Sequence, residues 1–135
     1  MTRTLALSLA WAGDGAAHLR GLLDRMGDEA FAAPSALPGW SRAHVLSHVA
    51  RNADAMMNLL YWARTGEETP AYVSREARDA DIAAGARRPP AAIREDVVST
   101  SDKMCVDKRM VLVLPRLRIS SRTSCVWLGA RPISL

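Results

Sequence analysis

An apolar seam near the N-terminus constrains the fold of this chain most. Apolar side chains recur there at alternating spacings of four and three residues: Leu5, Leu9, Ala12, Ala16, Leu19, Leu23 and Met26. This spacing places them on one face of a helix, and it is typical of helices that pack in bundles. The sequence therefore predicts a helix over residues 4–26 that must bury this face against other helices.

A second long helix is predicted over residues 41–65. Ser41 is a favourable N-cap, and Gly66 is a favourable residue just beyond the last turn. Trp40 stands where a hydrophobic staple would pack against Val45. We expect the two long helices to be antiparallel and to pack through Leu9, Leu19, Leu23, Val49, Met56 and Leu59.

The sequence predicts two further helices after residue 66. Ser74 is positioned to cap a segment over residues 75–84, with Gly85 as its stop, and Pro90 can occupy the first turn of another helix. Short connections between such helices favour an antiparallel bundle. We therefore predict an all-α fold: an incomplete four-helix bundle domain over residues 1–98, followed by an irregular tail.

The tail, residues 99–135, differs in composition from the rest. Residues 1–98 contain twenty-two Ala, and residues 99–135 contain one. A continued helix would need apolar residues near positions 100–101, 104 and 108, where the chain has Thr100, Ser101, Met104 and Lys108. This change favours a shift of reading frame, a truncation or a foreign C-terminus; the alternative is an ordinary divergent helix with a loop. We expect a poorly ordered tail, without a well-packed helix beyond about residue 105.

The charge and the cysteines narrow the functional classes. Residues 1–98 carry eleven Arg and twelve acidic residues, whereas the tail carries seven basic and two acidic residues, so the overall charge of +4 comes from the tail. The tail lacks the interleaved aromatic residues that stack nucleic-acid bases, so we expect no nucleic-acid partner. No apolar run is long enough to cross a membrane. With no signal peptide and only Cys105 and Cys125, we expect a cytoplasmic protein with free thiols.

His44 and His48 are four residues apart on the second predicted helix, and therefore on one face. Imidazole nitrogen is a zinc ligand, but a catalytic zinc needs three protein ligands and an open position. The alternative interpretation is one polar histidine near the helix start and one packed inside the bundle. Two histidines alone do not decide between them.

A resemblance to a known family adds to this reading. It is carried by residues 39–42 (GWSR), 45–50 (VLSHVA), 51–55 (RNADA), 62–66 (WARTG) and 74–82 (SREARDADI). Over about residues 3–98 the chain resembles the N-terminal domain of the mycothiol-dependent maleylpyruvate isomerases. The resemblance implies a DinB-like four-helix bundle.

By this resemblance, His48 is a metal ligand, the metal is zinc, and the thiol cofactor is mycothiol. Relatives tolerate other residues at the position of His44, which is therefore only an accessory candidate, from its place on the same helix face. The family completes its zinc site with a Glu and a His four residues apart on a later helix. This chain has no histidine after His48 and no glutamate after Glu95. We therefore expect zinc binding to be weak or absent.

Arg78 is a candidate substrate-binding residue, because the family's substrate is a dicarboxylate and a guanidinium binds a carboxylate through two parallel hydrogen bonds. The alternative is ion pairing at helical spacing, between Arg75 and Asp79 and between Arg78 and Asp81.

The resemblance implies a mycothiol-dependent maleylpyruvate isomerase-like protein with a small-molecule substrate. The reaction would be the thiol- and zinc-dependent cis–trans isomerisation of maleylpyruvate to fumarylpyruvate, impaired here because two metal ligands are missing. The alternative function is a non-catalytic helical-bundle interaction module or a gene fragment.

Overall fold

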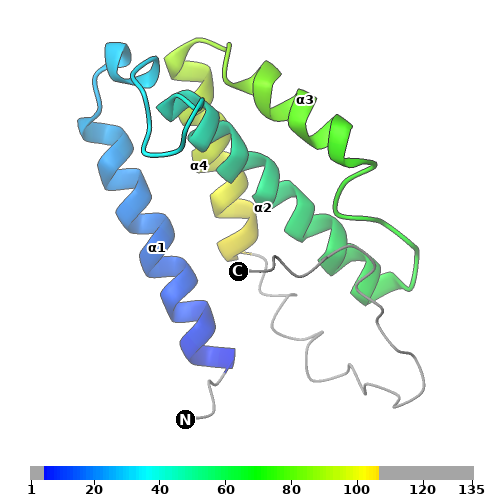
Figure 1. Cartoon of the computed structure of the whole chain (residues 1–135). Coiled ribbons are helices and arrows are strands. Elements are labelled where there is room, and N and C mark those ends of the chain that lie inside the picture. The colour runs from blue at the N-terminus through cyan, green and yellow to red at the C-terminus, as the bar shows by residue number, and fades with distance from the viewer. Residues whose placement is uncertain (1–4, 107–135) are drawn as a thin grey trace, which may run out of the picture.

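The computed structural model describes residues 5–106, and this part of the chain is helical without a strand. Four α-helices and one short 3-10 helix follow in order: α1 (Leu5–Arg25), η1 (Asp28–Phe31), α2 (Arg42–Thr65), α3 (Arg75–Gly85) and α4 (Pro90–Val106) (Figure 1). The predicted all-α bundle is confirmed. None of the described helices is both long enough and apolar enough to cross a membrane.

The helix limits follow from local capping. The Ser41 side chain accepts a hydrogen bond from the backbone N–H of His44, and the Ser41 N–H donates to His44 Nδ1, which closes a capping box at the start of α2. Gly66 ends this helix in the left-handed region, with a φ of 78°. Ser74 caps α3 by accepting from the Ala77 N–H at 3.0 Å. These three predicted caps are confirmed.

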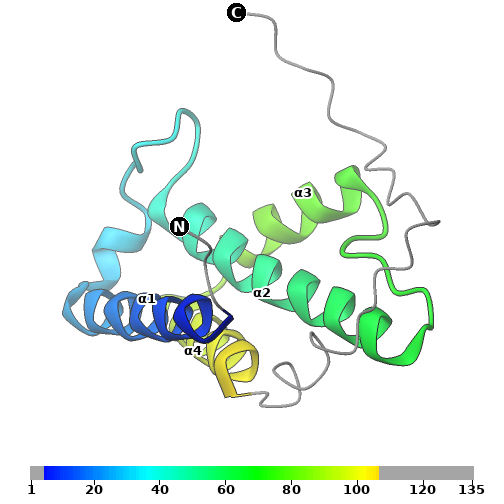
Figure 2. The ribbon, with the colours of Figure 1, turned by 90° about the horizontal axis from the view of Figure 1, so that it is seen from below.

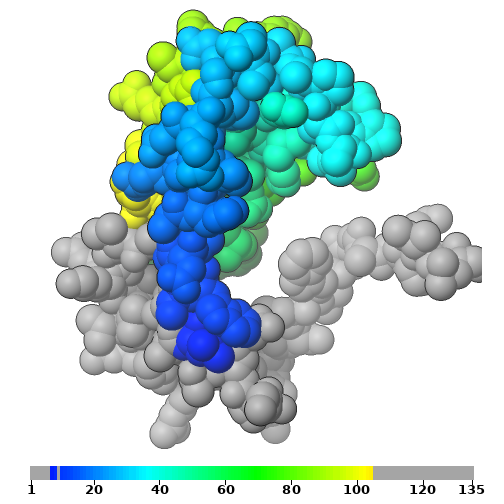
Figure 3. All heavy atoms as spheres, turned by 90° about the vertical axis from the view of Figure 1, so that its left-hand side faces the viewer, coloured from blue at the N-terminus to red at the C-terminus, as the bar shows by residue number. Residues whose placement is uncertain are grey.

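The helices alternate in direction, so that α1 and α3 run opposite to α2 and α4 (Figures 1 and 2). Helix α4 packs against both α1 and α2, and α3 packs against α2. The predicted antiparallel relation of the two long helices is confirmed, but α1 packs mainly against α4 rather than α2. In Figure 3, α1 runs as a column along one face, beside the connection that leads to α2.

The core lies where α1, α2 and α4 converge. Its buried members are Leu23, Phe31, Ala43, Leu46, Ala50, Ile93 and Val97. Leu19 and Val49 pack against this cluster, as predicted, whereas the Leu9 side chain lies outside the described residues.

The predicted packing of Met56 and Leu59 is wrong, since these side chains are 41% and 39% exposed. The buried seam of α2 passes through Leu46, Ala50 and Ala53, and its spacing of four and three continues to residues 57 and 60, which are partly buried. In the second half of α2, the predicted core positions were therefore shifted by one residue from the buried ones.

Helix α4 continues beyond the change of composition after residue 98. Thr100 and Ser101 are buried, although both are polar. The Thr100 hydroxyl donates to the backbone carbonyl of Asp96 at 2.8 Å, one turn earlier, so its burial leaves no hydroxyl proton unpaired. The predicted boundary at residue 98 falls inside α4. The predictions for the tail from residue 107 onward concern positions outside the described residues.

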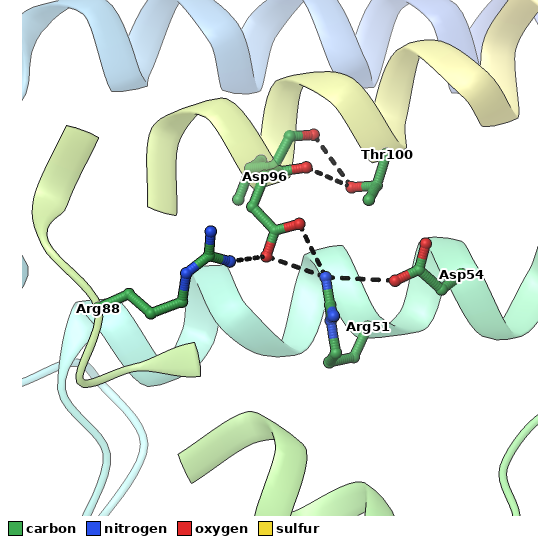
Figure 4. A network of polar contacts seen from close by, with 6 residues as sticks. Arg51, Asp54, Arg88, Asp96 and Thr100 are labelled. Atoms are coloured by element: carbon green, nitrogen blue, oxygen red, sulfur yellow. Dashed lines mark hydrogen bonds and ion pairs between the residues drawn. The ribbon is translucent and has the colours of Figure 1, made fainter. Parts of the chain in front are cut away.

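A half-buried ion-pair network joins α2 to α4 (Figure 4). The Asp96 carboxylate accepts from Arg51 Nη2 through both oxygens, at 2.8 and 2.9 Å, and from Arg88 at 2.8 Å. Asp54 lies on the other side of Arg51, at 3.2 Å. The network fixes the position of α4 along α2, because Asp96 is held from two directions.

Arg94 joins α4 to the C-terminal end of α1. Its guanidinium donates to the carbonyl oxygens of Leu23 and Met26, both at 2.5 Å, and to the Asp28 carboxylate at 2.8 Å. It also lies 4.6 Å from the centre of the Phe31 ring. One side chain thus supplies additional donors to carbonyls at the end of α1, where the Leu23 carbonyl also accepts from the Met26 N–H at 3.2 Å.

Candidate functional site

The N-terminal part of α2 presents both histidines to Trp40. The ring centres of Trp40 and His44 are 6.1 Å apart, and those of Trp40 and His48 are 5.8 Å apart in an edge-to-face arrangement. Both histidines are partly buried. Trp40 was expected to pack against Val45, but Val45 lines a different hollow, on the α1 side of α2.

The hydrogen bonds of the histidines limit what each nitrogen can do. His44 Nδ1 accepts the Ser41 N–H at 3.3 Å, so this nitrogen belongs to the helix cap. His48 Nδ1 lies 3.5 Å from Arg78 Nη2. Because a guanidinium can only donate, His48 Nδ1 is the acceptor, and the proton of the neutral ring is on Nε2.

The surroundings of His48 favour its neutral form. Burial of the ring lowers the pKa of His48 below its ordinary value, and the charge of the neighbouring Arg78 lowers this pKa further. A neutral imidazole is the form that binds metal ions. However, a cation bound at Nδ1 would displace Arg78, and a cation bound at Nε2 would move the ring proton to the nitrogen that faces the guanidinium.

The described residues do not fit a three-ligand zinc site. Within residues 5–106, no group of three or more His, Cys, Asp or Glu side chains lies close enough together to hold a metal ion. His44 and His48 share a face, as predicted, but no acidic side chain joins them. Cys125 and the side chain of Cys105 lie outside the described residues.

A cleft of about 430 Å³ opens between the start of α2 and α3. It is lined by Gly39, Trp40, His44, Arg75, Arg78, Asp79, Ile82 and Ala83. His48 is not among these residues, but it contacts two of them, Trp40 and Arg78.

The arginines of α3 were predicted either to bind a ligand or to form ion pairs. Arg78 does form an ion pair, at 2.6 Å, but with Asp79 rather than with Asp81. Its guanidinium carbon also lies 5.7 Å from the centre of the Tyr72 ring. Arg75 makes no ion pair within residues 5–106. The structure thus brings Arg75 and Arg78 to the same cleft.

A second hollow, of about 280 Å³, lies between α1 and α2. Its lining is mostly apolar and consists of Leu19, Leu22, Leu23, Met26, Ser35, Ala36, Arg42, Val45 and Leu46. Ligand sites combine apolar walls with a few convergent polar groups. The cleft beside α3 meets this description better, because two guanidiniums, an imidazole and an indole meet there.

The fold and the histidine-bearing second helix define a class: a DinB-like helical bundle, here with a cleft beside its third helix. Residues 12–106 match the family described as "Mycothiol maleylpyruvate isomerase N-terminal domain", and the chain belongs to this family. The family resemblance seen in the sequence is therefore confirmed.

Two solved structures are similar to the chain. One is the mycothiol-dependent maleylpyruvate isomerase, at 40% identity, and the other is a histidine-to-alanine mutant of it, at 39% identity; both give a TM-score of 0.75. Each match covers 78% of this chain and 46% of the solved chain, so the chain spans about half the length of these relatives. A comparison with curated proteins found no match.

Proposed function

We propose that this chain is a mycothiol-dependent maleylpyruvate isomerase-like protein whose isomerase activity is impaired. In this proposal, the ancestor of the chain catalysed the zinc- and mycothiol-dependent conversion of maleylpyruvate to fumarylpyruvate. Family membership supports the class of function. The observation that supports the impairment is the environment of His48: Arg78 lies 3.5 Å from its Nδ1, and no group of three metal-binding side chains is present among the described residues.

The expected loss of zinc affinity can be estimated from the number of zinc ligands. Catalytic zinc sites use three protein ligands, and metal affinity rises with each correctly placed ligand. His48, with His44 as an accessory, supplies too few donors, so we propose a zinc dissociation constant in the micromolar range or weaker (~1 μM or above). A thiol cofactor would then lack the cation that keeps it deprotonated at neutral pH.

A non-catalytic helical-bundle module is the second candidate function. It is favoured by the way residues 5–106 are held together without a metal: by caps, an apolar core, and the Arg94 and Asp96 contacts. Such a bundle would bind a ligand or partner without isomerising it. Reading the nucleotide sequence beyond codon 99 in all frames would separate the candidates, since a Glu-x-x-x-His helix in another frame favours the enzyme.

The test is a zinc titration combined with an isomerase assay on the full chain. We expect weak zinc binding that His48→Ala abolishes and that His18→Ala, at an exposed position of α1, leaves unchanged. We expect turnover of maleylpyruvate with mycothiol and zinc to be near the rate without protein. Tight, stoichiometric zinc binding with rapid turnover would contradict the proposed impairment and establish the chain as an active isomerase.

A further inference from the structure

The cleft beside α3 carries an excess of positive charge. Two guanidiniums line it, from Arg75 and Arg78, and Asp79 is the single acidic residue in its wall. Asp79 forms an ion pair with Arg78, and the Asp79 side chain is 54% exposed. Exposed pairs of this kind contribute little stability. An incoming anion can therefore replace Asp79 at small cost. Arg75 makes no salt bridge in the described part of the chain, where its charge acts on the carboxylate of its chain neighbour Glu76.

The two arginines are placed to act on one ligand. They stand three residues apart on the first turn of α3, so their Cβ atoms are about 5–6 Å apart on one side of the helix. Arg78 is oriented from two further sides, by the Tyr72 ring at 5.7 Å and by His48 Nδ1 at 3.5 Å. The positive end of the α3 dipole adds to the attraction for an anion.

The remaining walls select for size and shape. Trp40 offers a flat indole, and Ile82 and Ala83 line the cleft with apolar side chains. A volume of about 430 Å³ lies at the lower end of the range of small-molecule sites. The combination of a flat apolar wall and forked donors suits a small planar carboxylate, because a guanidinium matches a carboxylate through two parallel hydrogen bonds.

We propose that the cleft lined by Trp40, Arg75 and Arg78 is a metal-independent binding site for a small carboxylate, with both guanidiniums as its ligands. Arg75 thereby becomes a second anion-binding residue beside Arg78. The inference deepens the proposed function, since a carboxylate-bearing substrate would use this site. Binding itself requires neither zinc nor a thiol, so the two proposals can fail separately.

Fumarate is a suitable probe, titrated into the full chain at neutral pH with EDTA present, by calorimetry and by ¹H–¹⁵N NMR. We expect saturable binding with a dissociation constant of about 1 mM, and a shift of the Trp40 indole N–H but not of the Trp62 indole N–H. Arg75→Gln and Arg78→Gln should each weaken binding by about tenfold or more, because each removes charge-assisted hydrogen bonds.

Two controls make the result specific. Arg87→Gln removes the same charge at an exposed position that does not line the cleft, and it should leave binding within about twofold. Fumaramide, which has the same shape without charge, should not bind. Absence of fumarate binding, equal losses in Arg87→Gln, or shifts centred on Trp62 would each overturn the site. Binding of inorganic phosphate with tenfold or greater preference over fumarate would overturn its assignment to carboxylates.

Discussion

Replacing Gly85 by alanine would test the close approach of α3 to α2. A Cβ atom built at Gly85, the last residue of α3, would lie 2.1 Å from Ser47 Oγ and 3.1 Å from Ser47 Cβ. Ser47 is 3% exposed, so it has little room to move away. The glycine therefore serves the contact between the helices, and we expect Gly85→Ala to destabilise the protein.

The magnitude follows from two opposing effects. Alanine is favoured over glycine in a helix by about 1 kcal/mol. Rotation of the Ser47 side chain can relieve the contact at Oγ, but the contact at Cβ remains, and overpacking of this kind costs about 1–3 kcal/mol. Because Gly85 is at the end of α3, the helical gain is partial. We expect a net loss of about 1–2 kcal/mol, or about 5–10 °C in Tm for a domain of this size.

Thermal and urea unfolding followed by circular dichroism would measure this change. The matched control is Gly15→Ala in α1, where a new Cβ meets nothing within 4 Å, and this variant should gain about 0.5–1 kcal/mol. Ser47→Ala removes Oγ, so it should reduce the cost of Gly85→Ala in a double-mutant cycle. If Gly85→Ala were as stabilising as Gly15→Ala, the reasoning on close helix approach would be refuted.

Three more predictions concern the polar contacts of the bundle. Arg94→Lys should lower the free energy of unfolding by about 2 kcal/mol in urea titrations, because an ammonium cannot donate in the forked geometry that reaches the end of α1. Asp96→Asn should cost about 2–3 kcal/mol in the same assay, whereas Asp102→Asn, in a half-exposed ion pair, should cost less than about 1 kcal/mol. An NMR titration should find the pKa of His48 below 6.5, and Arg78→Gln should raise this pKa only in part, since burial is the larger cause. The stability that the neutral His48 contributes should be present above pH 6.5 and be lost as the pH falls from 6.5 through the lowered pKa; a flat profile there would contradict this.

The helix limits were predictable because their causes are local. Ser41, Ser74 and Gly66 act within one turn of their own positions, so their residue types sufficed. Gly85 was predicted as a helix stop, and α3 does end at this residue, but its φ is not positive. Its role depends on Ser47, which is distant in sequence and becomes its neighbour only through tertiary packing.

The candidate site was predictable as single residues but not as an arrangement. His48 and Arg78 were each named from the sequence, yet their 3.5 Å contact requires α3 to fold back on α2. Trp40 was assigned a packing role, and its contacts with both histidines were missed. An aromatic residue directly before the N-cap was the available signal, because it lies about one turn from His44 and two turns from His48.

The position of α4 between α1 and α2 has a consequence for the order of folding. The contact between Arg94 and Leu23 closes 71 residues of chain, and the contact between Arg20 and Asp102 closes 82. Contacts among α2, α3 and α4 join residues that are closer in sequence: the contact between Arg51 and Asp96 closes 45 residues of chain. Because longer closures cost more entropy before contacts form, α2, α3 and α4 should assemble first and α1 should dock last. Weakening the Arg94 contacts should therefore accelerate unfolding and leave the folding rate nearly unchanged.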